Sequence, residues 1–154
     1  MNEPGPFPTV AREALDAVAG AMAAVHPWVE AVYLFGSRAR GDGRPSSDVD
    51  LAVLPGPSGP PVDRLAAEAE LARFAEDRLG APVDVVLIRR ELSPALLFDI
   101  FSVETILYAG DWETAHRVAC QARAEYRDLR PRLERAFQRT RPQIEDLANA
   151  LNRS

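Results

Sequence analysis

Three short runs rich in β-branched and aromatic residues constrain most strongly how this chain can fold. They read VEAVYLF at residues 29–35, DVDLAVL at 48–54 and PVDVVLI at 82–88. Such runs are typical of strands. Between and around them lie segments in which apolar residues recur every three or four positions, as they do on one face of a helix. This alternation predicts an α/β or α+β fold in which helices pack against a sheet.

The remaining elements follow from periodicity and from residues that end helices. We expect helices from residue 9 to Pro27, over 62–79, over 94–101 and from 111 onward, with a fourth, edge strand at 105–108. Pro131 lies inside the last helical pattern. Because proline cannot donate a backbone hydrogen bond and crowds the preceding turn, that helix either kinks or restarts there.

The chain divides into three predicted parts. These are a flexible lead-in at residues 1–8, a core at 9–110 and a C-terminal helical extension at 111–154. A length of 154 residues suits one compact domain, and 47% hydrophobic residues suffice for a packed core. No apolar run approaches the roughly 18 residues of a membrane span, so we expect no membrane association.

The expected compartment is the cytoplasm. The opening residues, MNEPGPFPTV, contain no basic residue and no apolar segment, so we expect no signal peptide. The single cysteine, Cys120, excludes a disulfide framework within the chain and a cysteine-based zinc site.

Charge is distributed unevenly along the chain. Residues 117–154 hold nine arginines against five acidic residues, whereas residues 1–116 hold nine against eighteen. An acidic body with a basic tail is a poor general nucleic-acid binder, and we expect no direct sequence-specific nucleic-acid binding. The tail arginines are typical either of a solvated helix face or of a docking surface for an acidic protein partner. No lysine is present, which excludes lysine-based nucleophilic chemistry.

Two motifs and one further aspartate place chemically active residues on or beside the predicted strands. Gly36 and Ser37 directly follow the first run, Asp48 and Asp50 begin the second, and Asp84 lies inside the third. Acids at i and i+2 share one face of a strand, about 7 Å apart. If the third strand lies beside the second, three carboxylates converge. Like charges that close favour a hard divalent cation with oxygen ligands, and Mg²⁺ is the natural candidate.

The Gly-Ser motif supplies the other half of a candidate site. A glycine lets a phosphate approach the backbone, and free N–H groups at a helix start bind anions. Ser37 adds a hydroxyl donor, and Arg38 and Arg40 can offer forked donors to phosphate oxygens. A triphosphate-binding loop beside a two-metal carboxylate cluster is suited to nucleotidyl transfer.

The segment GSRARGDGRPSSDVDLAVL has ten residues between its Gly-Ser and its Asp-Val-Asp. In this it resembles the polymerase-β-like nucleotidyltransferases. It is most similar to their minimal nucleotidyltransferase (MNT) branch, and the small size and helical tail resemble MntA-type antitoxins, which pair with a HEPN-domain RNase toxin. The resemblance covers roughly residues 29–108. It implies a small mixed sheet flanked by helices with a C-terminal helical extension, and transfer of AMP from ATP to a tyrosine of the toxin, which silences it.

The resemblance also implies roles by position. Gly36 and Ser37 match the phosphate-binding pair, and Asp48 and Asp50 match metal ligands, in a site that holds two Mg²⁺ ions. Asp84 matches the third carboxylate, which ligates one metal and helps to deprotonate the acceptor hydroxyl.

The two arginines of the loop match the family less evenly. Arg40 corresponds to the basic residue often found before the second glycine of this loop, and Arg38 matches less closely.

Other interpretations stay open. A Gly-Ser pair alone is typical of a turn that ends a strand. The aspartate pair is also typical of a solvated strand face. Asp84 could instead form an ion pair with Arg89 or Arg90. The acceptor could instead be a small-molecule hydroxyl, as in aminoglycoside nucleotidyltransferases. A third possibility is an antitoxin that only binds its partner, without catalysis.

Overall fold

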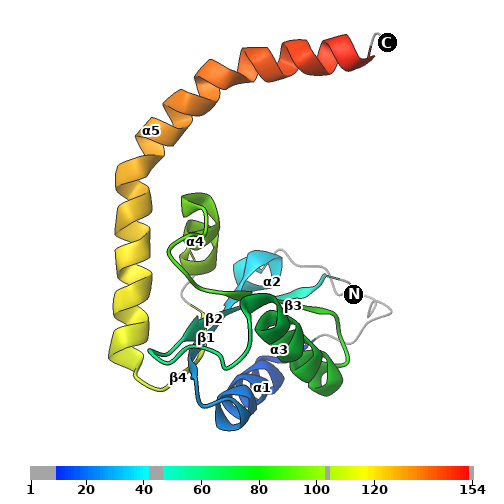
Figure 1. The fold of residues 1–154 in the computed structure, drawn as a ribbon, viewed down its shortest axis with the longest axis vertical. Coiled ribbons are helices and arrows are strands. Elements are labelled where there is room, and N and C mark those ends of the chain that lie inside the picture. Colours follow the sequence, from blue (N-terminus) through cyan, green and yellow to red (C-terminus); the bar gives the residue numbers. More distant parts are fainter. Residues whose placement is uncertain (1–9, 42–46, 103–104, 153–154) are drawn as a thin grey trace, which may run out of the picture.

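The computed structural model describes residues 10–41, 47–102 and 105–152, so the predicted lead-in at 1–8 lies outside the described residues. Figure 1 shows the arrangement of the elements. In chain order they are α1 (Arg12–Val25), β1 (Val29–Phe35), α2 (Gly36–Arg40), β2 (Val49–Pro55), α3 (Arg64–Leu79), β3 (Val83–Leu87), α4 (Pro94–Phe101), β4 (Ile106–Ala109) and α5 (Trp112–Asn152). The predicted alternation of helices and strands is confirmed, with boundaries shifted by at most three residues.

The four strands form one mixed sheet in the order β3-β2-β1-β4. β1 is antiparallel to both β2 and β4, whereas β2 and β3 are parallel. Two parallel neighbours need a crossover connection, which α3 provides. Because β2 and β3 run in the same direction, both begin at the same end of the sheet.

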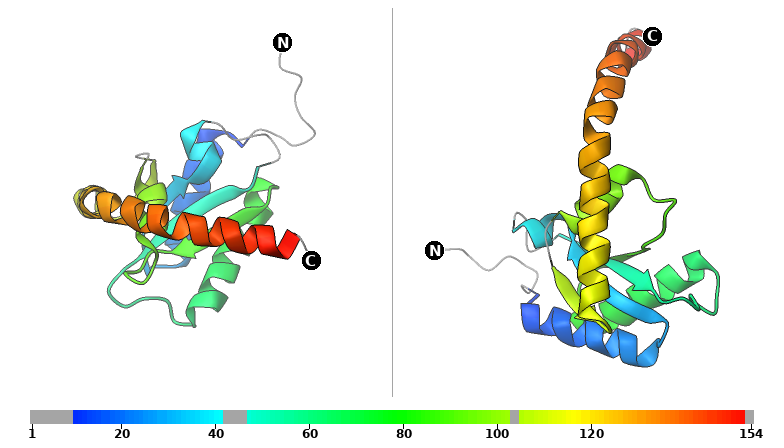
Figure 2. Two further views of the ribbon diagram at one scale, coloured as in Figure 1. Left: turned by 90° about the horizontal axis from the view of Figure 1, so that it is seen from above. Right: turned by 90° about the vertical axis from the view of Figure 1, so that its left-hand side faces the viewer.

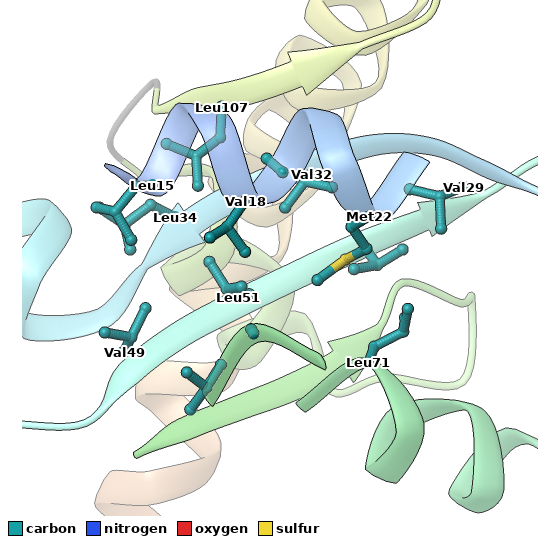
Figure 3. Packing of buried hydrophobic residues seen from close by; sticks show 14 of the residues in the cluster. Leu15, Val18, Met22, Val29, Val32, Leu34, Val49, Leu51, Leu71 and Leu107 are labelled. Atoms are coloured by element: carbon teal, nitrogen blue, oxygen red, sulfur yellow. The ribbon is translucent and has the colours of Figure 1, made fainter. Parts of the chain in front are cut away.

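Helices cover both faces of the sheet. Strand residues that alternate in sequence separate into two clusters, so Val49, Leu51 and Val53 pack with α1 and α3, whereas Ala52 and Leu54 pack with α4 and α5. Figure 3 shows the first cluster, in which Met22 of α1 and Leu71 of α3 are fully buried. The side chain at position 50 therefore belongs to the α4 and α5 face.

Local sequence fixes the ends of the crossover helix. The carboxylate of Asp63 accepts a hydrogen bond from the backbone N–H of Ala66 at 3.1 Å, so the helix that we expected from residue 62 begins at Arg64. At the other end Gly80 adopts a left-handed conformation (φ 64°), which is typical of a glycine that follows the last residue of a helix.

The C-terminal helix α5 is continuous through two prolines, Pro131 and Pro142. It leaves the sheet alongside α4 and then bends over the core (Figure 1). Of the two outcomes predicted at Pro131, a kink or a restart, the structure has a curved helix without a break, as expected where proline removes one backbone hydrogen bond. No helix among the described residues combines the length and apolar character needed to cross a bilayer.

Candidate functional site

Asp50 and Asp84 are neighbours across the parallel strands β2 and β3. In the register of the two strands Val49 is opposite Val83, and Asp50 is opposite Asp84 at the next position. Adjacent strands lie about 4.8 Å apart, so the two side chains leave the sheet next to each other. Asp48 lies one residue before β2 and is exposed. The fold thus brings the three predicted aspartates to one end of two adjacent strands.

Gly36 joins β1 to α2 directly beside Asp50. The residue before it, Phe35, is the partner of Asp50 across the antiparallel pair β1 and β2. Gly36 has φ +74°, and a Cβ atom added to it would overlap Oδ2 of Asp50 and lie 3.1 Å from its Cγ. Both the backbone conformation and the close approach therefore require glycine. The approach brings Ser37, the second residue of α2, to the same corner of the sheet.

The two arginines of α2 make different contacts. Arg40 forms an ion pair with Asp99 of α4, with Nη1 to Oδ1 at 2.8 Å. Arg38 donates from Nε and Nη2 to the carbonyl oxygen of Ser47, at 3.0 and 2.7 Å. Arg38 therefore fixes the backbone immediately before Asp48, whereas Arg40 connects α2 to α4. Their predicted contacts with a nucleotide remain predictions.

Electrostatics single out Asp50 among the carboxylates. Its side chain is half-buried, whereas Asp48 and Asp84 are exposed. Burial raises the pKa of Asp50, and the negative charges of Asp84, Asp48 and Asp99 raise it further, while Arg40 lowers it. Asp50 thus lies among like charges, which Arg40 opposes.

The carboxylates do not form a closed metal site in the described protein. Within residues 10–41, 47–102 and 105–152, no three His, Cys, Asp or Glu side chains are arranged closely enough to hold a metal ion. Arg89 pairs with Glu68 at 3.8 Å, and this contact differs from the alternative in which it pairs with Asp84. The corner therefore presents adjacent acidic side chains without a preformed triad.

Sequence reasoning missed Asp99. It lies in the otherwise apolar helix PALLFDIF, contacts Arg40, and adds to the negative charge around Asp50. A single acid in such a helix is a signal that could have marked it, because a carboxylate on an apolar helix usually has a charged partner.

A cavity of about 510 Å³ lies between the sheet, α4 and α5. Its wall includes Leu54 of β2, Leu97 and Phe101 of α4, and Val118 and Ala122 of α5. Leu54 is four residues after Asp50 in the same strand, so both side chains belong to one face of the sheet. The cavity and the aspartates are thus on the same side of the molecule.

A protein-family model described as "Polymerase beta, Nucleotidyltransferase" matches residues 21–113. These residues include all the predicted site residues. No curated protein is significantly similar to the chain.

Several solved structures resemble the chain. One is a toxin–antitoxin with AMP-PNP, with a TM-score of 0.60 and 24% identity over 86% of this chain and 98% of the other. A second is a tri-AMPylated Shewanella oneidensis HEPN toxin in complex with MNT antitoxin, with a TM-score of 0.58 and 22% identity over 90% and 99%. A third is a variant of the toxin–antitoxin MntA–HpeT, with a TM-score of 0.57 and 25% identity over 83% of this chain and 93% of the other. The first two likenesses show a shared fold.

Proposed function

The chain belongs to the polymerase beta nucleotidyltransferase family, and from this premise we propose that it transfers AMP from ATP to a tyrosine hydroxyl of a HEPN toxin and thereby acts as the antitoxin. The observation that carries the proposal is the pairing of Asp50 with Asp84 beside the close approach of Gly36. Structural neighbours described as a toxin–antitoxin with AMP-PNP and as an AMPylated HEPN toxin with MNT antitoxin support the nucleotide and the partner.

In this proposal Gly36 and Ser37 bind the phosphates of ATP, and Asp84 acts on the acceptor hydroxyl. Gly36 gives the triphosphate access to the backbone, and Ser37 donates a hydrogen bond to it. The acceptor oxygen forms a bond to the α-phosphorus, the bond to the β-phosphate oxygen breaks, and pyrophosphate leaves. The proton of the hydroxyl passes to Asp84, which is exposed beside Asp50 and forms no ion pair with any arginine that the structure describes; Arg89 pairs with Glu68 instead.

The donor set fits Mg²⁺. Asp48, Asp50 and Asp84 offer only carboxylate oxygens, and their mutual repulsion, which contributes to the raised pKa of Asp50, is relieved by a bound cation. We assign these three side chains as the ligands, with two ions as the family resemblance implies. When bound, Mg²⁺ supplies positive charge against the phosphate oxygens of ATP.

Arg40 has a second part in this scheme. It pairs with Asp99, and both side chains are about two-fifths exposed. An exposed ion pair of this kind is weak, on the order of 0–1 kcal/mol. Loss of the contact with Asp99 therefore costs little when Arg40 turns to a phosphate oxygen.

The test is transfer of label from α-labelled ATP to the purified HEPN protein of the same toxin–antitoxin pair. We expect a labelled toxin band with the wild-type chain and Mg²⁺, and a loss of at least about 100-fold with Asp50→Asn or Asp84→Asn. Asp77→Asn is the matched control, because Asp77 is an exposed carboxylate on α3, on the opposite face of the sheet. Transfer at the wild-type rate by Asp50→Asn would contradict the metal-ligand role.

Two other outcomes separate the remaining interpretations. Label on an aminoglycoside, and none on the protein, would assign a small-molecule acceptor. Tight binding of the toxin without any label would indicate an antitoxin that acts by binding alone. The cytoplasmic location expected from the sequence stays a prediction.

A further inference from the structure

The distal part of α5 extends beyond the core. Ala115 and Ala119 near its start are buried, and the ring of Tyr126 stacks on Phe98 of α4 with centroids 4.1 Å apart. Beyond Tyr126, no described side chain of α5 belongs to either core cluster. We call residues 127–152 the arm. At 1.5 Å per residue it is about 39 Å long.

The arm bends over the face of the sheet that carries the aspartates. α1 and α3 lie on one side of the sheet and α4 on the other, and α5 rises on the α4 side (Figure 1). Seen from above in the left panel of Figure 2, the arm crosses over the core. Pro131 and Pro142 lie inside α5, and prolines within a helix are a usual cause of such a bend. A protein held by the arm therefore faces the side of the sheet to which Asp50 and Asp84 belong.

Apolar residues follow the arm at helical spacing. Leu129 and Leu133 are half-buried, while Leu147 and Leu151 towards the end of the arm are 63% and 70% exposed. The leucines within each pair are four residues apart and the two pairs are 18 residues, or five turns, apart, so all four lie on one face of the helix. Such an apolar face on a surface helix is typical of one that packs against another element. Among the residues that the structure describes, no element covers the exposed leucines at the distal end of this face.

Charge identifies the kind of partner. Residues 127–141 hold six arginines against two acidic residues. Arg130 pairs with Glu134 at 2.8 Å and Arg141 with Glu145 at 3.0 Å. The other four arginines make no ion pair with any described residue; they are Arg127, Arg132, Arg135 and Arg139. Of these four, Arg132 and Arg139 lie nearest to the leucines around the helix axis. An apolar stripe with arginines along one edge fits an apolar groove that has carboxylates along one edge.

The first turns of α5, before the arm, lie between the leucine stripe and the face of the sheet that carries Asp50 and Asp84. Val118, Ala122 and Glu125 line the cavity of about 510 Å³ between α4, α5 and the sheet, together with Leu54. A segment of the partner that enters the cavity thus lies along β2, four residues from Asp50. The arm, the cavity and the aspartates form one continuous side of the molecule.

We propose that the arm is the docking surface for the acceptor protein, a HEPN-domain partner that receives the leucine stripe in an acid-bordered apolar groove. The inference rests on the proposed function, which supplies the acceptor. The family match ends at residue 113, so the arm is a feature that the catalytic core does not itself require. Its two prolines set the direction in which the bound acceptor is presented.

The experiment compares three variants of the full-length chain. Leu133→Asp with Leu147→Asp puts charge on the stripe, and Gln138→Asp with Asn149→Asp makes the same change at exposed positions on the other side of the helix. The third, Pro131→Ala with Pro142→Ala, favours a straighter helix and cannot lower its intrinsic stability. Binding of purified HEPN protein, binding of ATP and transfer of label are measured for each.

We expect the leucine variant to weaken HEPN binding at least about tenfold while ATP binding stays within about twofold. The matched control should bind as the wild type does. The proline variant should bind HEPN protein normally but transfer label at least about tenfold more slowly, because the acceptor is held in the wrong direction. Circular dichroism checks that all three remain helical.

Two results would overturn the inference. Unchanged HEPN binding by the leucine variant would show that the acceptor docks elsewhere. A wild-type dimer that becomes monomeric in the leucine variant, with HEPN binding retained, would assign the stripe to a second copy of this chain. Failure of the proposed function has a different signature, since HEPN protein would then bind through the arm and receive no label.

Discussion

At the scale of single residues, the site depends on how closely one backbone approaches one carboxylate. Gly36 combines a left-handed conformation with contact to Asp50, so its hydrogen atom occupies the only space that the carboxylate leaves. A side chain there would move either the Gly-Ser loop or the aspartate, and both belong to the proposed chemistry.

Gly36→Ala is expected to abolish transfer and to cost about 1–3 kcal/mol of unfolding free energy, through backbone strain and overlap with Asp50. Gly41→Ala is the control, because Gly41 has a similar φ of +80° but nothing within 4 Å of an added Cβ. It should lose a comparable amount of stability from strain and retain much more transfer. Denaturant unfolding and the labelling assay measure both properties. Equal loss of transfer in the two variants would show that contact with Asp50 is unimportant.

Some of these residue-level features could be predicted from the sequence, for physical reasons. The Gly-Ser and Asp-x-Asp motifs lie at strand ends that local composition marks clearly, and alternation along a strand puts Asp50 on one face. The pair between Arg40 and Asp99 could not be predicted. The two residues are 59 positions apart, and their contact depends on how α4 packs across the sheet.

At the scale of elements, the N-terminal end of α5 is held in place by a buried tyrosine and by a capping aspartate. Tyr33 of β1 is 2% exposed and donates a hydrogen bond to the carbonyl oxygen of Ala115 at 3.1 Å. Its ring meets Phe101 edge-to-face, with centroids 5.1 Å apart. Burial raises the pKa of the Tyr33 hydroxyl, which therefore stays a donor. This contact ties the central sheet to the helix that carries the arm.

Tyr33→Phe should destabilise the fold by about 1 kcal/mol, because it leaves the ring in place and removes one buried hydrogen bond. Tyr126→Phe is a suitable control, since the Tyr126 hydroxyl makes no hydrogen bond within the described part of the chain and its ring stacking on Phe98 is kept. Thermal and denaturant unfolding report the difference. Equal stability of the two variants would contradict an anchoring role for the hydroxyl.

Asp111 makes the start of α5 sensitive to acid. Its carboxylate accepts hydrogen bonds from Thr114 Oγ1 at 2.5 Å and from the backbone N–H of Glu113 at 3.1 Å. These bonds, chiefly that from Thr114, hold the pKa of Asp111 below its usual value. Because the folded-state pKa is lower than the unfolded one, the stability from Asp111 is complete above about pH 4 and is lost as the pH falls through the folded-state pKa.

Asp111→Asn keeps a capping side chain but cannot ionise. We expect the wild type to be the more stable protein at neutral pH and its advantage to shrink on acidification below about pH 4. Unfolding by urea at a series of pH values measures the difference. A difference that stays constant with pH would show that the carboxylate charge does not stabilise this helix start.

The elements themselves were largely predictable, and the course of α5 was not. Strand composition and helical periodicity gave the order of elements, and Asp63 and Gly80 mark the ends of α3 by ordinary capping chemistry. At Pro131 the same rules allowed a kink or a restart. Whether a helix survives an internal proline depends on the stability of the turns on either side, which a local pattern does not contain.

At the scale of the whole molecule, an acidic body carries a basic arm. The acids include those of the proposed site, and the arginines concentrate in the part of α5 that leaves the core. Charges of opposite sign on one chain allow a partner to be attracted by one region and acted upon by another. The sequence showed this asymmetry, but the side of the sheet on which the arm bends emerges only from the packing of α4 and α5 (Figures 1 and 2).

The parallel pairing of β2 with β3 also governs when the protein can act during its own synthesis. Asp84 comes beside Asp50 only after the crossover helix α3 has formed and β3 has joined the sheet. A nascent chain that has left the ribosome as far as α3 already exposes the Gly-Ser motif and two of the aspartates, but β3, which carries the third, has not yet joined the sheet. On the proposed chemistry such a fragment is inert, so translation and folding of β3 act as a built-in checkpoint before any AMP is transferred.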